Sequence, residues 1–300
     1  MKKRILPLTE KRNPRSRDID RFATLRIVRL INSEDRLVVP AVGNQSRAIA
    51  AAVEMIVKRF RRGGRLFYVG AGTSGRLGVL DAAECPPTFG VPPTLVQGII
   101  AGGRRALVRA VEGAEDNESA GATVIDRRRI RSRDVVVGIA ACGLTPFVRA
   151  ALKRALAIGA GTIFITCSPE AVSHVPAEIV INPVVGPEVI TGSTRMKAGT
   201  ATKLVLNTLT TVTMIRLGKV YGNLMVDLKA TNNKLRDRSV RIVMEMTGLS
   251  RRAAAKLLAR ADGRVKLAIV MHHRSVSVTR AAEILDDCGQ LLRKAIEDRK

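Results

Sequence analysis

The chain has 300 residues, of which 46% are hydrophobic, enough for a packed core and too many for a disordered chain. Lysine and arginine number 51 against 26 aspartate and glutamate, a formal net charge of +25 that would attract phosphorylated ligands. Aromatic residues make up only 3% and basic residues are spread along the chain, which disfavours a nucleic-acid partner. The densest basic run, residues 127–133, is expected to be the exposed end of a helix.

The hydrophobic pattern alternates between short apolar runs and helical segments. Residues 1–45 are polar and basic, with a helical pattern after Asp18. Strands are expected at residues 65–69, 94–100, 134–140, 162–166 and 178–181, and helices at 45–62, 76–85, 103–113, 117–130 and 146–158. Val/Ile-rich runs that alternate with helices predict an α/β fold, a mostly parallel sheet with helices on both faces.

The remainder of the chain lacks strand patterns. Residues 193–245 are expected to be helical, followed by small helices at residues 251–261, 265–271 and 279–297. We place a domain boundary near Gly248, which predicts an α/β domain with an N-terminal helical extension over residues 1–247 and a small helical domain over 248–300.

No segment predicts membrane insertion or export. The longest apolar run, residues 204–217, is short and carries Asn207 and Arg216. The basic residues 2–4 are followed by too short an apolar run for a signal peptide. Four separated cysteines without a CxxC pair fit a reducing compartment. The expected location is the cytoplasm, with no membrane partner.

The sharpest local pattern is a glycine-rich turn between a predicted strand and a predicted helix. It is Gly70-Ala71-Gly72-Thr73-Ser74-Gly75-Arg76. Glycines let the backbone approach an anion, and the N–H groups of a helix start point at it. A dinucleotide site would also need an acidic residue after the next strand, and residues 94–98 offer none. Gly72, Thr73 and Ser74 therefore favour a single phosphate; the alternative is a tight turn without a ligand.

Two further turns are candidates for the same site. Cys142, Gly143 and Thr145 follow the predicted strand 134–140, and turns at the carboxyl ends of neighbouring parallel strands converge. Residues 183–197 form a Gly- and Pro-rich segment with Glu188 among apolar residues. A carboxylate in such a place is either salt-bridged or functional, and the sequence favours neither.

Two more carboxylates stand in unusual places. Glu84 ends a predicted helix, where a negative charge is disfavoured, and its Ala, Cys and Pro neighbours predict apolar surroundings that would suit a general acid. The alternative is an exposed helix end. Glu115 lies in an acidic turn of a basic chain, where capping of the next helix is the competing explanation. The histidines, at positions 174, 272 and 273, lack a metal-ligand spacing, so no metal site is expected.

Several longer segments that contain these motifs together resemble the N-acetylmuramic acid 6-phosphate etherases. The resemblance is carried by Gly70–Gly90, Val111–Asn117, Asn182–Ala201 and Leu217–Lys234, with Thr9–Pro14 near the start. Several long blocks in order over nearly the whole chain are far more specific than any one motif. The resemblance implies a sugar isomerase (SIS) type α/β domain with a small helical C-terminal domain, in agreement with the predicted elements.

The resemblance also implies a lyase reaction. Such enzymes cleave the D-lactyl ether of N-acetylmuramic acid 6-phosphate to give N-acetylglucosamine 6-phosphate and D-lactate, by C2 deprotonation, β-elimination and water addition. This chemistry needs two proton-transfer groups and no cofactor. The family's pair falls on Glu84 as proton donor and Glu115 as base.

For the sugar phosphate, the resemblance implies a pocket formed by the first two turns, completed by Ser193 and Thr194, with Glu188 and Lys197 as further candidates. It also implies a homodimer. Two positions depart from the family pattern Ala-Ala-Ser-Gly-Arg-Thr-Pro, namely Cys142 in place of Ser and Leu144 in place of Arg. A thiol donates weakly and leucine carries no charge, so lower affinity or another substrate is expected.

Two other functions use the same fold. A phosphosugar-sensing regulator would bind the ligand without needing an acid–base pair, so the presence of both glutamates argues against it. An aldose–ketose isomerase would share proton abstraction at C2 but would release no lactate.

Overall fold

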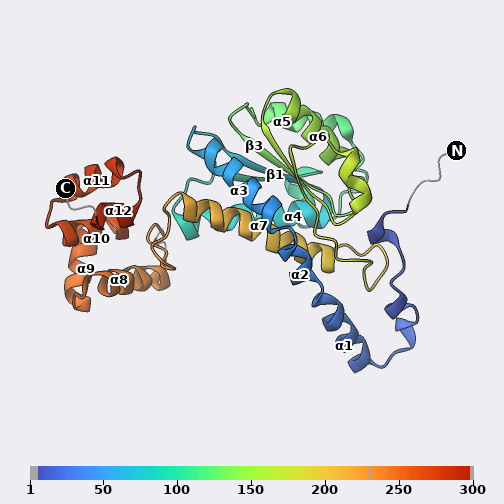
Figure 1. Ribbon diagram of the computed structural model, residues 1–300, viewed down its shortest axis with the longest axis horizontal. Coiled ribbons are helices and arrows are strands. Elements are labelled where there is room, and N and C mark those ends of the chain that lie inside the picture. The colour runs from blue at the N-terminus through green and yellow to red at the C-terminus, as the bar shows by residue number, and fades with distance from the viewer. Residues whose placement is uncertain (1–5, 229, 231, 298–300) are drawn as a thin grey trace. The chain divides into compact units, whose positions relative to one another are not determined.

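The computed structural model describes residues 6–228, 230 and 232–297 (Figure 1), so the basic residues 2–4 lie outside it. The chain divides into two units. One is Met1–Ala83 with Thr94–Thr210, and the other is Glu84–Pro93 with Thr211–Lys300. The domain boundary near Gly248 stays a prediction.

The first unit contains all the strands that the structure describes. They are β1 (Leu66–Gly70), β2 (Val96–Ile100), β3 (Val135–Ile139), β4 (Gly161–Ile165) and β5 (Ile179–Ile181). The α-helices that begin in this unit are α1 (Thr24–Asp35), α2 (Val38–Gly43), α3 (Ser46–Phe60), α4 (Gly72–Phe89), α5 (Glu118–Arg127), α6 (Pro146–Ala157) and α7 (Lys197–Arg216). Short 3₁₀ turns are η1 (Leu8–Glu10), η2 (Pro14–Ser16), η3 (Ile19–Arg21), η4 (Gly103–Leu107) and η5 (Pro169–His174).

The five strands form one parallel sheet in the order β2-β1-β3-β4-β5. All five predicted strands are confirmed, and so is the α/β class. Because side chains alternate between the two faces of a strand, the buried Phe67 and Tyr68 show that both faces are covered. Figure 1 shows α5 and α6 on one side of the sheet and α3 and α7 on the other. Phe67 packs in the cluster that includes Phe147 and Leu152 of α6.

Two helix predictions fail at glycines. The predicted helix 103–113 is only the turn η4 followed by a loop, since Gly102, Gly103 and Gly113 have left-handed backbones, which a right-handed helix cannot contain. The predicted helix 279–297 is broken between α11 and α12 for the same reason at Gly289 and Gln290.

Other helices differ in extent. The predicted helix 76–85 begins earlier, at Gly72, and continues to Phe89 through two prolines. The predicted helical stretch 193–245 is interrupted by a loop after Arg216, in which Gly218 and Gly222 have left-handed backbones. The basic run 127–133 follows the expectation, because α5 ends at Arg127 and most of the run is exposed.

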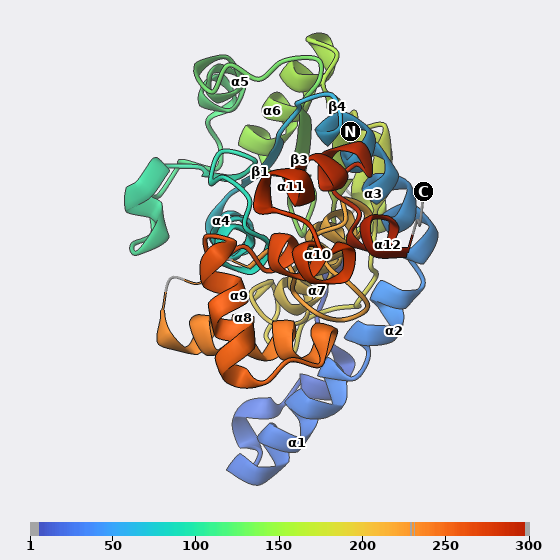
Figure 2. The same cartoon turned by 90° about the vertical axis from the view of Figure 1, so that its left-hand side faces the viewer.

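The second unit is built from small helices. They are α8 (Asn233–Thr247), α9 (Arg251–Arg260), α10 (Val265–Arg274), α11 (Val278–Asp287) and α12 (Leu292–Glu297). Both views show these helices side by side (Figures 1 and 2). The buried face of α10, with Leu267, Ile269 and Val270, packs at the centre of their common core. Within the described residues, no helix has the length and apolar content needed to cross a membrane.

The contact between α5 and α6 provides a test of packing. A Cβ atom on Gly121 of α5 would overlap the carbonyl oxygen of Phe147 in α6. We expect Gly121→Ala to lower the free energy of unfolding by about 1–3 kcal/mol, the usual cost of overpacking. Gly43→Ala in α2 is the matched control, because a Cβ there meets nothing within 4 Å. Its free energy of unfolding should remain unchanged or rise by up to about 1 kcal/mol. Urea unfolding of both variants measures this, and equal stabilities would contradict it.

Candidate functional site

A cavity of about 230 Å³ lies at the carboxyl ends of β1 and β2. It contains the glycine-rich turn, through Gly72 and Arg76, and the acidic loop, through Glu112 and Glu115. The remaining lining is Ala71, Ala101, Ala106, Ala110, Val111, Gly113 and Ala114. The structure thus brings Glu115, the base predicted from the sequence, and the glycine-rich turn predicted to bind phosphate together at the sheet edge where α/β proteins bind ligands.

The glycines of this turn have different physical roles. A Cβ on Gly70 would lie 2.7 Å from the backbone nitrogen of Gly75, and one on Gly75 would lie 2.6 Å from Ile100. Those two glycines therefore permit close packing of the strand, the turn and the helix. Gly72 is different, because it has a φ of +51° and a Cβ there would meet nothing within 4 Å. Its exposed backbone faces open space at the start of α4, where a helix favours an anion.

The second turn is joined to the acidic loop through the backbone. Glu115 accepts a hydrogen bond of 2.9 Å from the N–H of Phe147 at the start of α6. Gly143 has a φ of +77°, and a Cβ there would overlap the side chain of Ala171, so only glycine fits. Burial raises the pKa of the half-buried Cys142 thiol, and the negative charges of Glu10 and Glu115 raise it further.

The start of α7 lies close to both the first and the third turn. A Cβ on Gly199 of α7 would lie 3.6 Å from the methyl group of Thr73 and 3.4 Å from the carbonyl oxygen of Thr194. Ser193, Thr194, Thr73 and Ser74 are all half-buried. The predicted hydroxyl-bearing residues of the first and third turns therefore come from adjacent segments. Thr145 of the second turn is also half-buried and precedes Pro146, the first residue of α6.

Glu188 and Lys197 have partners inside the protein. The Glu188 carboxylate is 0% exposed and accepts hydrogen bonds from the N–H groups of Lys197, at 3.0 Å, and Ala198, at 2.9 Å. It thus satisfies the free donors at the start of α7. The Lys197 ammonium lies 2.6 Å from Glu34, with both side chains at most 3% exposed. These contacts give both residues a structural role, and their predicted role in the substrate site stays a prediction.

The electrostatics of this cluster follow from burial and pairing. Burial acts to raise the pKa of Glu34, but the Lys197 ammonium, Asn13 and Arg15 together lower it below the ordinary 4.5. Glu188 lacks such a direct ion pair. Burial therefore raises its pKa despite the hydrogen bonds from the α7 backbone and the Lys197 charge, which lower it.

Glu84 lies on α4 within the second unit, apart from the cavity lining. The expectation that it ends a helix is wrong, because α4 continues to Phe89. Its side chain is exposed while its neighbours Cys85 and Phe89 face the core, so the expected apolar surroundings are also absent from the chain as described. Its predicted role as proton donor stays a prediction.

Sequence reasoning missed several residues at this end of the sheet. Arg76 lines the cavity and donates a hydrogen bond of 3.0 Å to the carbonyl oxygen of Leu107. The sequence signal that could have found Arg76 is its position directly after the last glycine of the turn, about one helical turn from the start of α4. Glu10 approaches the third turn, since a Cβ on Gly192 would lie 2.9 Å from its carboxylate. Nothing local distinguishes this glutamate from a surface residue.

Asp81 was also missed, and it fixes the helix that carries the phosphate turn. It is buried and accepts hydrogen bonds from the hydroxyl of Tyr68 on β1, at 2.9 Å, and from Asn207 and Thr210 on α7, at 2.7 and 3.2 Å. Burial raises the pKa of Asp81, although these hydrogen bonds act to lower it. The carboxylate therefore ties α4 to the sheet and to α7.

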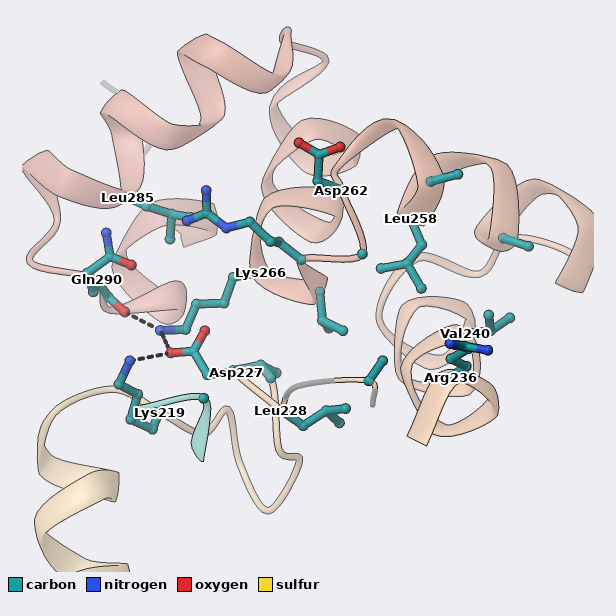
Figure 3. Close-up of a pocket in the computed structure, with 18 residues that line it drawn as sticks. Lys219, Asp227, Leu228, Arg236, Val240, Leu258, Asp262, Lys266, Leu285 and Gln290 are labelled. Carbon is teal, nitrogen blue, oxygen red and sulfur yellow. Dashed lines mark hydrogen bonds and ion pairs between the residues drawn. The ribbon is translucent and has the colours of Figure 1, made fainter. Parts of the chain in front are cut away.

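A larger cavity of about 810 Å³ lies within the second unit (Figure 3). At one end the Asp227 carboxylate lies 2.7 Å from the Lys266 ammonium and 3.0 Å from that of Lys219. Lys266 also donates to the carbonyl oxygen of Gln290, at 3.0 Å. Burial lowers the pKa of Lys266, and Asp227 opposes this shift. None of the site residues predicted from the sequence lines this cavity.

The histidines make ordinary contacts. The ring of His273 hydrogen-bonds the carbonyl oxygen of Met246, and that of His174 hydrogen-bonds the carbonyl oxygen of Glu170, both at 2.8 Å. Among the residues that the structure describes, no group of three or more His, Cys, Asp or Glu side chains is arranged to hold a metal.

Comparison with known proteins places this geometry in a class. The glucokinase regulatory protein N-terminal SIS domain matches residues 48–156, and the C-terminal lid domain of glucokinase regulatory protein matches residues 222–265. The phosphoheptose isomerase of Neisseria gonorrhoeae aligns with a TM-score of 0.47 and 16% identity, over 63% of this chain and 97% of that one. The two family matches identify an SIS-type α/β domain over residues 48–156 and a lid-like helical region over residues 222–265.

Comparison with curated relatives identifies the family more specifically. N-acetylmuramic acid 6-phosphate etherases from Synechococcus sp. (strain CC9902) and Brucella anthropi are each 54% identical, covering 97% and 98% of this chain and 92% and 95% of those proteins. The etherase of Rhodopirellula baltica is 54% identical over 93% of this chain and 92% of its own length. This chain belongs to the N-acetylmuramic acid 6-phosphate etherase family. The resemblance and the enzyme class predicted from the sequence, a carbon–oxygen lyase, are confirmed.

The buried pair of Lys197 and Glu34 generates a prediction. Lys197→Met leaves Glu34 buried without its cation, so the free energy of unfolding should fall by about 3–5 kcal/mol. Because the pKa of Glu34 is lowered in the folded protein, its contribution is present above the pKa of the unfolded state and is lost as pH falls through the lower folded value. The variant should lose much of this acid sensitivity. Urea unfolding between pH 3 and 7 measures it.

Lys203→Met, at an exposed position of the same helix, is the control and should change stability by less than about 0.5 kcal/mol. In Glu34→Gln/Lys197→Met the loss should be smaller than the sum of the two single losses, since the residues are coupled. A Lys197→Met protein of normal stability with a raised KM would instead show that Lys197 binds substrate.

Proposed function

We propose that this protein cleaves the D-lactyl ether of N-acetylmuramic acid 6-phosphate and releases D-lactate and N-acetylglucosamine 6-phosphate. The observation that carries the proposal is the match to etherases at about half identity along nearly the whole chain. The cavity supports it physically, because it joins a carboxylate, an arginine and a glycine-rich helix start within about 230 Å³. The reaction belongs to the recycling of cell-wall amino sugars.

The proposed mechanism begins on the open-chain aldehyde form of the sugar. Glu115 as base accepts the proton from C2, and the electron pair of that C–H bond forms the C2–C3 double bond. The C3–O bond breaks, and Glu84 as acid protonates the departing lactate oxygen, since an alkoxide is a poor leaving group. Water then adds its oxygen at C3 and a proton at C2. The exposed side chain of Glu115 suits access to a solvent-borne substrate.

The phosphate end is proposed to bind at the start of α4. The exposed Gly72 backbone and the hydroxyls of Thr73 and Ser74 supply neutral donors, and the guanidinium of Arg76 supplies charge in the same cavity. In the second turn, burial raises the pKa of Cys142, so its thiol is neutral and offers a weak S–H donor. Leu144 is 46% exposed and presents an apolar side chain beside these donors.

We further propose that two copies of the chain associate through α1. Leu25 and Val28, three residues apart on this helix, are 59% and 57% exposed, so they form one apolar stripe on its outer face. Figures 1 and 2 both show α1 projecting from the rest of its unit. The four cysteines lie within the described residues and form no disulfide, which supports a reducing location, and we infer the cytoplasm.

The first prediction concerns the two glutamates. Glu84→Gln and Glu115→Gln should each lower kcat for D-lactate release by about a hundredfold to ten-thousandfold, the usual contribution of a general acid or base. In deuterated water, the Glu115 variant should lose exchange of the C2 proton, whereas the Glu84 variant should retain it because deprotonation precedes loss of lactate. Coupled lactate detection and NMR measure the two steps.

Glu118→Gln, an exposed carboxylate at the start of α5, is the control and should leave kcat unchanged. Interconversion of aldose and ketose phosphates without lactate release would identify an isomerase. Tight binding of the sugar phosphate with neither reaction would identify a regulator.

A separate prediction concerns the dimer. Leu25→Glu/Val28→Glu places two charges on the stripe of α1, so sedimentation velocity should show a monomer where the unaltered protein sediments as a dimer. Leu156→Glu, at another exposed apolar position, should leave the dimer intact. A dimer that survives the double change would place the interface elsewhere.

A further inference from the structure

A second charged cavity, unrelated to the proposed reaction, lies at the amino ends of β1 and β3. It measures about 240 Å³ and is lined by Gly63, Arg65, Arg129, Arg131 and Arg133. Four of its five lining residues are arginines, and none is acidic. Three of these arginines, Arg129, Arg131 and Arg133, belong to the densest basic run of the sequence, which the proposed etherase reaction does not use.

One buried carboxylate organises the cavity. Asp134 is 0% exposed and pairs with the Arg65 guanidinium at 2.7 Å. It also accepts hydrogen bonds from the backbone N–H groups of Arg65, at 2.8 Å, and Arg131, at 2.9 Å. Its acceptor positions are thus engaged by the two loops that border the cavity. Asp134 neutralises Arg65 alone, which leaves the charges of the other three arginines uncompensated.

The backbone of these loops is held in place without any ligand. Arg65 donates a hydrogen bond of 2.8 Å to the carbonyl oxygen of Arg129, whose φ is +49°. A Cβ on Gly64 would overlap the carbonyl oxygen of Arg133, so the two loops touch and only glycine permits it. The arginine backbones are therefore preorganised, which reduces the entropy lost when a ligand binds.

Arg129, Arg131 and Arg133 form no ion pair with any residue that the structure describes. The nearby carboxylate of Asp126 is engaged by Arg154 at 2.9 Å. Arg61, Arg62, Arg127 and Arg128 are exposed on the same two segments and add to the positive field. A concave surface with one sign of charge concentrates ions of the other sign.

The cavity is also remote from the proposed substrate site. Gly63 and Arg65 precede β1, whereas Gly72 follows it, so the two cavities lie at opposite edges of the sheet. A strand of five residues spans roughly 16 Å. A ligand here would leave the catalytic edge free, and a substitution here need not disturb it.

We propose that this cavity binds the polyphosphate group of a small molecule, with two or more phosphoryl groups. Guanidinium groups match phosphoryl oxygens in pairs of parallel hydrogen bonds, and three uncompensated arginines match the charge of a diphosphate. The cavity's modest volume of about 240 Å³ favours a compact anion. Its lining contains no aromatic side chain, so it lacks the stacking surface that single-stranded nucleic acid uses.

The test is calorimetric titration of the full-length protein with inorganic pyrophosphate, with N-acetylglucosamine 6-phosphate present to occupy the proposed substrate site. We expect one pyrophosphate per chain, with affinity that falls as sodium chloride rises. Arg131→Gln/Arg133→Gln should weaken binding at least about tenfold for each lost charged contact. The backbone bonds to Asp134 remain in this variant, so its melting temperature and lactate release should match the unaltered protein.

Arg252→Gln/Arg260→Gln removes the same charge from exposed positions of α9 and should leave pyrophosphate binding within about twofold of the unaltered value. Equal weakening in both double variants would show a non-specific charge effect and overturn the proposal. Absence of pyrophosphate binding overturns it as well. A 12-nucleotide RNA that binds through Arg131 and Arg133 where pyrophosphate does not would replace it with a nucleic-acid surface.

Discussion

The buried ion pair between Lys197 and Glu34 fixes the amino-terminal segment against the third turn and the start of α7. The ammonium belongs to the first residue of α7, while the carboxylate belongs to α1, and their separation is 2.6 Å in a dry environment. Glu34 also accepts from Asn13 at 2.8 Å, and Asn13 donates to the carbonyl oxygen of Pro187 at 3.2 Å. One charge pair therefore joins the amino-terminal segment, the third turn and α7. Since an unpaired buried charge costs several kcal/mol, these three segments are ordered together.

The parallel sheet explains why segments distant in sequence meet at one edge. Every strand runs in the same direction, so each turn that follows a strand arrives at the carboxyl edge, and helices that begin there present their free N–H groups to it. Asp81 then sets the position of α4 against β1 and α7. The glycine-rich turn lies at the surface, but the buried polar contacts of Asp81 fix the helix that begins in it.

The sequence predicts the strands well because each is a short Val/Ile-rich run that needs burial on both faces. It predicts the glycine-rich turn because three glycines within seven residues follow a strand run, whereas Glu115 is singled out by the family resemblance and its role as base stays a prediction. Prediction from sequence fails where the surroundings of a side chain depend on residues that are distant along the chain. Whether Glu188 is functional or salt-bridged was open, and its actual partners are the backbone donors of α7, which no local pattern indicates. The apolar surroundings expected for Glu84 fail similarly, because the helix phase turns Cys85 inward and Glu84 outward.

The distribution of charge connects the basic surface to the chemistry. In a chain of net charge +25, Glu10, Glu112 and Glu115 approach the carboxyl edge of the sheet, while arginines dominate the cavity at the amino edge. The long-range field of such a chain attracts a phosphorylated substrate, and Arg76 supplies a local positive charge in the same cavity as Glu115. Glu112 and Glu115 give the cavity at the carboxyl edge two acidic side chains beside that arginine, whereas the lining of the cavity at the amino edge holds no acidic side chain. The two edges of the sheet therefore differ in charge: the carboxyl edge offers both signs within one cavity, as the proposed binding of an anion and removal of a proton require, and the amino-edge cavity is lined by arginines without an acidic side chain.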